Sequence, residues 1–149
     1  MPQVKVHLTF DEPVLDEAVV RRVKPTYSDL SGFGITAYSK REILAEKLRS
    51  LLQQQKKWPR PRDLYDLWYI LCKSGEHFAW KELKPLFEEK CRIRGLQPDV
   101  AGLTSDTLRE WNENAWLRQL RPMLQDVPDF DRAWKKWVET FHGWVEDTK

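Results

Sequence analysis

The spacing of apolar residues changes once along this chain, close to Tyr38, and that change limits the folds open to it. Before Tyr38, apolar and polar residues alternate, which is typical of strands with one buried face. The predicted strands cover residues 4–10, 18–23 and 34–38. After Tyr38, apolar residues recur every three or four positions, which predicts helices. The sequence therefore predicts an α+β fold, with a small N-terminal sheet of two or three short strands followed by a bundle of about five helices.

Local start and stop signals divide the helical part. Pro59 and Pro61 separate the first helix from the second, because proline cannot continue a helix. Gly95 is typical of a helix end, and either Thr104 or Ser105 is typical of a helix start. The predicted helices span residues 39–55, 63–73, 80–94, 105–124 and 131–145.

Length and composition favour one domain in the cytoplasm. A chain of 149 residues has the size of a typical domain. We expect a single domain over residues 1–149, with residues 1–38 as a partial sheet and 39–149 as the helical part. No apolar run approaches the ~20 residues of a membrane span, and two cysteines are too few for a disulfide scaffold. We therefore expect a cytoplasmic protein with no membrane partner. A net charge of +2 does not by itself indicate nucleic-acid binding.

Lys47 stands inside the apolar stripe of the first helix, where a charge is costly. Ile43 and Leu51 lie four residues to either side of it, on the same helix face. Its ammonium either extends past the edge of the stripe into water or meets an acid. Asp63 and Asp66 open the next helix, where they could cap free N–H groups or suit the helix dipole. Because helices joined by a short loop pack antiparallel, Lys47 could instead meet one of these aspartates.

The segment from residue 39 to residue 62 is locally basic. It contains eight lysines and arginines against two glutamates. Such a patch attracts phosphate groups, and the ring of Trp58 could stack on a base. Lys40, Arg49, Arg62 and Trp58 are therefore candidate substrate-binding residues, with Arg49 expected on the exposed outer face of the first helix. The alternative, which is common, is a solvated helix face and loop.

Two motifs flank the basic loop: A-E-K-L-R-S-L at residues 45–51 and R-D-L-Y-D-L at residues 62–67. Together they resemble the AbiEii/AbiGii family of nucleotidyltransferase toxins from bacterial abortive-infection toxin–antitoxin systems. The Trp-containing segments N-E-N-A-W-L-R-Q-L and P-D-F-D-R-A-W-K-K-W also fit the helical C-terminal part of that family. The resemblance covers most of the chain.

The resemblance implies a nucleotidyltransferase-like fold, in which a small mixed sheet joins a helical bundle. It also implies transfer of a nucleotide from a nucleoside triphosphate, with Mg²⁺ as cofactor, to a target such as tRNA. By the same resemblance, Lys47 would contact the triphosphate. Asp63 or Asp66 would lie in the active site and position the lysine or the substrate. These three residues are the predicted catalytic set.

Part of the family pattern has no counterpart in these 149 residues. The family's chemistry starts with a Gly-Ser motif on a helix and an Asp-x-Asp on a strand, whose carboxylates hold Mg²⁺. The Asp-x-Asp at residues 129–131 follows a proline at a helix start, a position typical of a cap. His7 stands where some members carry a further acid. We therefore expect a chain that matches the back two-thirds of the toxin, has no metal site and is inactive alone, while retaining weak triphosphate or RNA binding.

A second class of function stays open, that of a non-catalytic interaction module. An unpaired sheet edge and the Trp-rich helices would then bind a cognate antitoxin or a second copy of the chain. Trp134, Trp137, Phe141 and Trp144 recur at helical spacing, which is more typical of a core than of a ligand site. A third alternative is a broken gene, whose protein product folds but has no function maintained by selection.

Overall fold

The computed structural model of the chain describes residues 12–55 and 57–146. The chain divides into two compact units, Met1–Ser39 and Lys40–Lys149. This division falls one residue after the expected boundary between sheet and helices. That the two units fold as a single domain stays a prediction. The predicted strand at residues 4–10, including His7, lies outside the described residues.

The first unit contains a two-stranded antiparallel sheet of β1 (Val19–Val23) and β2 (Phe33–Ala37). Arg21 stands opposite Ile35 in the centre of the register. The side chains of Val20 and Ile35 are exposed. Both strands agree with the prediction to within about a residue, and the α+β class is confirmed.

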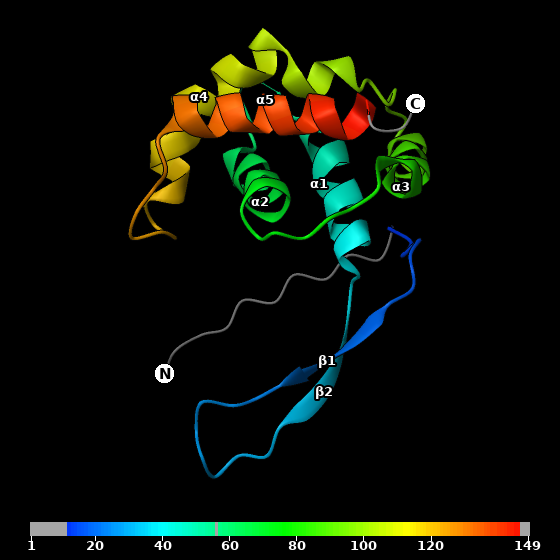
Figure 1. The fold of residues 1–149 in the computed structure, drawn as a ribbon, viewed down its shortest axis with the longest axis vertical. Helices are drawn as coiled ribbons and strands as arrows, with labels where there is room; N and C mark the ends of the chain where they lie inside the picture. Colours follow the sequence, from blue (N-terminus) through cyan, green and yellow to red (C-terminus); the bar gives the residue numbers. More distant parts are fainter. Residues whose placement is uncertain (1–11, 56, 147–149) are drawn as a thin grey trace. The chain divides into compact units, whose positions relative to one another are not determined.

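The second unit is helical (Figure 1). It contains α1 (Lys40–Gln53), α2 (Pro61–Cys72), α3 (Trp80–Ile93), the short 3₁₀ helix η1 (Ala101–Thr104), α4 (Asp106–Leu120) and α5 (Phe130–Glu146). The five predicted helices are therefore present. The fourth ends four residues earlier than expected, and η1 was not predicted. Ser105 caps α4, with its side chain accepting a hydrogen bond from the backbone N–H of Leu108.

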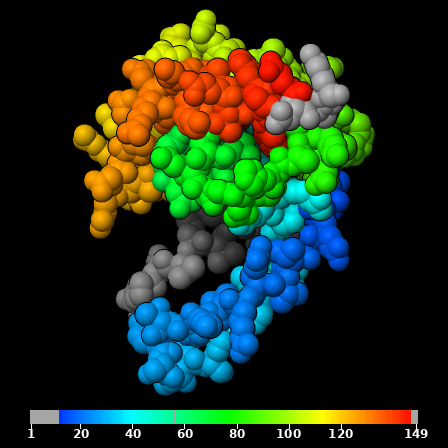
Figure 2. Space-filling model, in the orientation of Figure 1, coloured from blue at the N-terminus to red at the C-terminus, as the bar shows by residue number. Residues whose placement is uncertain are grey.

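Helix α1 packs between two neighbours, α3 on one side and α2 on the other. Helix α2 also contacts α4 and α5, and Figure 2 shows α5 (orange to red) lying directly against α2 (green) on one face of the unit. The seam between α1 and α3 is partly polar. There Lys90 of α3, almost fully buried, lies 2.5 Å from the carboxylate of Glu42.

Aromatic side chains of α5 form much of the core, as the sequence predicts. Trp137 and Phe141 are almost fully buried, with their ring centroids 4.9 Å apart. The indole N–H of Trp137 donates to the backbone carbonyl of Leu103, 3.1 Å away, and so ties α5 to η1. Trp134 and Trp144 are partly buried against this cluster. The stripe is therefore a core element and not a ligand site.

Substitutions of two leucines in the last turn of α4 test which face of this helix packs into the core. Leu120 is fully buried, whereas Leu117 is 52% exposed. Leu120→Ala should lower the free energy of unfolding by about 2–5 kcal/mol, because it leaves a cavity. Leu117→Ala, the matched control, should change it by less than about 0.5 kcal/mol. Urea unfolding measures both, and equal effects would contradict the assigned packing of α4.

Candidate functional site

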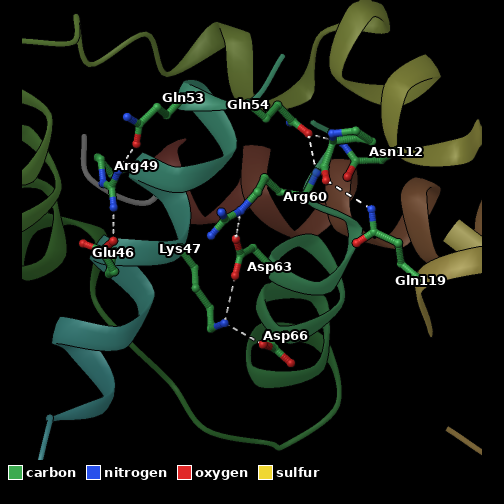
Figure 3. Close-up of polar contacts among 11 residues, drawn as sticks. Glu46, Lys47, Arg49, Gln53, Gln54, Arg60, Asp63, Asp66, Asn112 and Gln119 are labelled. Atoms are coloured by element: carbon green, nitrogen blue, oxygen red, sulfur yellow. Dashed lines mark hydrogen bonds and ion pairs between the residues drawn. The ribbon is translucent and has the colours of Figure 1, made fainter. Parts of the chain in front are cut away.

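The ammonium of Lys47 lies between two carboxylates of the following helix (Figure 3). Lys47 Nζ is 3.1 Å from Asp63 Oδ1 and 2.5 Å from Asp66 Oδ2. The side chains of Lys47 and Asp63 are 21% and 13% exposed, whereas that of Asp66 is 41% exposed. The structure thus brings the three predicted catalytic residues together at the edge of the shared core of α1 and α2. Lys47 meets acids instead of extending past the stripe into water.

The electrostatics of the cluster keep Lys47 charged. Burial alone would lower the pKa of Lys47, but the hydrogen bond to Asp66 and the charges of Asp63 and Asp66 together raise it above its ordinary value. An ammonium has three N–H donors, and two of them face these carboxylates. Among the described residues, no third acceptor lies within hydrogen-bond distance of Nζ. One donor therefore faces no acceptor within the described part of the chain.

Asp63 does not act as a helix cap. The residue before α2 is Arg60, no side chain caps that end, and Pro61 begins the helix. The two carboxylate oxygens of Asp63 face different cations: Oδ1 faces Lys47, and Oδ2 accepts a hydrogen bond from Arg60 Nε at 2.7 Å. Lys47, Asp63 and Asp66 together form what we call the Lys47 cluster. Asp63 therefore joins this cluster to the basic loop that precedes α2.

Two amides that the sequence analysis missed hold the loop before α2. Gln54 Oε1 accepts hydrogen bonds from the backbone N–H of Arg60 (2.9 Å) and from Asn112 Nδ2 (3.2 Å). Asn112 is fully buried in α4. It follows Leu108 by four residues, so a polar residue inside an apolar face was the signal that could have found it. On α4, Gln119 Nε2 lies 3.4 Å from the carbonyl of Pro59.

A groove of about 780 Å³ opens beside this loop. It is lined by Lys57, Trp58, Pro59, Arg60, Arg62, Asp63, Arg118 and Gln119. The predicted residues Trp58 and Arg62 therefore lie in one groove, and Asp63 connects it to Lys47. Arg118 and Gln119 had no motif to indicate them, because they come from α4, more than 50 residues along the chain.

The other two predicted substrate-binding residues lie elsewhere. Arg49 is 5% exposed, and its guanidinium bonds to Glu46 and Gln53 (Figure 3). The expectation that Arg49 lies on an exposed outer face is therefore wrong, because that face of α1 is covered by α3. Lys40 pairs with Glu76 and stands two turns before Lys47, about 10 Å along the helix axis.

The described residues do not fit a magnesium site. Within residues 12–55 and 57–146, no group of three His, Cys, Asp or Glu side chains is placed to hold a metal ion. Asp63 and Asp66, the carboxylates nearest the candidate site, already face Lys47 and Arg60. No step of chemistry through Mg²⁺ follows from these residues.

A family model described as the nucleotidyl transferase AbiEii toxin of type IV toxin–antitoxin systems matches residues 1–139. The chain belongs to this AbiEii family. No curated protein and no solved structure gave a match. The Lys47 cluster and the basic groove both lie within the matched residues of the AbiEii model. This membership confirms the resemblance and makes the chain a nucleotidyltransferase-like toxin.

None of the helices described in this AbiEii chain combines the length and apolar character that crossing a membrane would require. The expected cytoplasmic location stays a prediction.

A double-mutant cycle tests the Lys47–Asp63 contact. Lys47→Met and Asp63→Asn should each lower the free energy of unfolding by about 1–3 kcal/mol, because each leaves a half-buried charge with fewer partners. The coupling energy between them should exceed about 0.5 kcal/mol. Asp66→Asn, the matched control on the same lysine, should couple by less, because its side chain is more exposed. Urea unfolding of the variants measures these values, and additive effects of Lys47→Met and Asp63→Asn would show that the contact contributes nothing.

Proposed function

We propose that the Lys47 cluster is the triphosphate-binding part of a nucleotidyltransferase site, with Lys47 contacting phosphate oxygens and Asp63 positioning the lysine. Transfer of a nucleotide from a nucleoside triphosphate to a target such as tRNA is the reaction in which the cluster would take part. The observation that carries the proposal is the position of Lys47 Nζ, between Asp63 and Asp66 on consecutive helices.

The desolvation free energy that the Lys47 cluster costs supports a role in binding phosphate. A half-buried ion pair contributes little net stability, because desolvation offsets the attraction between its charges. Lys47 nevertheless has a raised pKa and one donor facing no acceptor among the described residues. Asp66 is the more exposed of the two aspartates, so it could turn into water when a phosphate oxygen takes its place. A permanently charged, pre-positioned ammonium is what a phosphate site requires.

We further propose that the 149-residue chain does not catalyse transfer by itself. Phosphoryl and nucleotidyl transfer need metal ions to neutralise charge developing on the phosphates. The sequence contains no Gly-Ser followed by a strand-borne Asp-x-Asp, and the described residues hold no metal-binding cluster. The metal-binding carboxylates would therefore have to come from outside the described residues.

Two measurements on the chain test this pair of proposals. Incubation with Mg²⁺, labelled nucleoside triphosphates and tRNA should give no labelled RNA, and clear labelling would refute inactivity. Titration with each of the four triphosphates should show weak binding that Lys47→Met reduces at least about tenfold, the value of one charge-assisted hydrogen bond.

The matched control for the binding measurement is Lys81→Met, an exposed lysine on α3. It removes the same charge away from the site and should leave triphosphate binding unchanged. Equal weakening by Lys47→Met and Lys81→Met would mean that the chain attracts triphosphates only through its overall charge.

The exposed sheet supports a second candidate function, that of an interaction module. Val20, Phe33 and Ile35 present apolar side chains on a two-stranded sheet, and Val20 is 77% exposed. Such a sheet suits pairing with a second copy or with another protein of the system. Sedimentation should then give a dimer mass that Val20→Lys with Ile35→Lys returns to the monomer. A monomer at all concentrations would contradict self-association.

A further inference from the structure

The groove beside the Lys47 cluster has a surplus of positive charge. Its lining includes four cationic side chains and one acid, Asp63, which is already paired with Arg60. For the other three cations, Lys57, Arg62 and Arg118, no acid among the described residues lies within ion-pair distance. Cations held without acidic partners on a concave surface attract anions.

Trp58 gives the same groove an accessible ring. Its side chain is 66% exposed, although the backbone that carries it is held in place. The backbone N–H of Trp58 donates to the backbone carbonyl of Gln55 at 2.8 Å. The side chain of Gln54 anchors the next part of the loop by accepting a hydrogen bond from the backbone N–H of Arg60. Lys57 Nζ lies 5.5 Å from the ring centroid. An aromatic ring presented in this way, beside cations, is a platform on which an unpaired base can stack.

The cations and the ring of Trp58 together indicate which ligand fits the groove. They come from three segments, the loop at residues 57–60, the start of α2 and the last turn of α4. A polynucleotide strand carries one phosphate per nucleotide, so a groove lined by several cations beside an exposed ring can hold its backbone and one of its bases together. Stacking on Trp58 further requires a base that is not in a duplex.

We propose that this groove binds single-stranded nucleic acid, with a base stacked on Trp58 and with Lys57, Arg62 and Arg118 contacting its phosphates. The inference rests on the proposed function in one respect, namely that the bound strand is the acceptor of the transferred nucleotide. Asp63 lines the groove and also contacts Lys47. A strand in the groove would therefore pass next to the group proposed to hold the triphosphate.

The test is a fluorescence titration of the whole chain with labelled single strands of roughly 12 nucleotides, within the usual range of binding-site sizes. The probes are oligouridine RNA, oligothymidine DNA and an RNA duplex of equal length. Triphosphate and Mg²⁺ are left out, so failure of triphosphate binding or of transfer cannot affect the result. Both single strands should bind more tightly than the duplex, and tighter binding of the RNA would assign the groove to RNA.

Charge contacts are tested by a matched pair of variants. Both Arg118 and Arg132 are exposed arginines on helices, but Arg132 lines a different basic depression, between α2 and α5. The logarithm of the binding constant should fall with the logarithm of salt concentration at a slope of about −2 for three phosphate contacts. Arg118→Gln should bring the slope to about −1.4, whereas Arg132→Gln should leave it unchanged.

Stacking is tested at Trp58. Trp58→Ala should weaken single-strand binding at least about fivefold, and Trp58→Phe should recover part of the loss, because a smaller ring still stacks. Absence of single-strand binding, equal effects of the two arginine variants, or no effect of Trp58→Ala would overturn the inference. Displacement of the strand by an equal concentration of free triphosphate would also overturn it, since the groove would then be a mononucleotide site.

Discussion

The contact between the Lys47 ammonium and the Asp63 carboxylate is the interaction on which the candidate site depends. A lysine inside an apolar stripe is costly unless an acid meets it, so the sequence of α1 requires a partner from a neighbouring helix. Asp63 provides it at 3.1 Å, with Asp66 at 2.5 Å on the more exposed side. The contact lies at the edge of the packed interface between α1 and α2.

Two electrostatically different regions meet at Asp63. On one side, Lys47, Asp63, Asp66 and Arg60 balance one another's charges at short range. On the other side, the groove is strongly cationic. A balanced cluster can position one ammonium accurately, whereas an unbalanced groove can attract and align a polyanion. The loop before α2 belongs to both regions, and the buried side chains of Gln54 and Asn112 hold it through hydrogen bonds.

Most of the fold and the centre of the site could be predicted from local patterns. The change of periodicity gave the described strands and the five helices, and the misplaced charge of Lys47 indicated its partners. The expected position of Arg49 was wrong because α1 has two covered faces, and the stripe of one helix does not reveal a second, polar seam with α3. Arg118 and Gln119 were missed because they reach the groove through tertiary packing of α4, which no spacing along the chain records.

The role of Lys47 in phosphate binding is decided by a crystal structure of the chain with a non-hydrolysable nucleoside triphosphate. A phosphate oxygen is expected within about 3 Å of Lys47 Nζ, with Asp63 still in contact with the lysine and Asp66 turned away. A nucleotide bound elsewhere, with Lys47 still held by both aspartates, would contradict it and leave the cluster as a structural ion pair of the AbiEii fold.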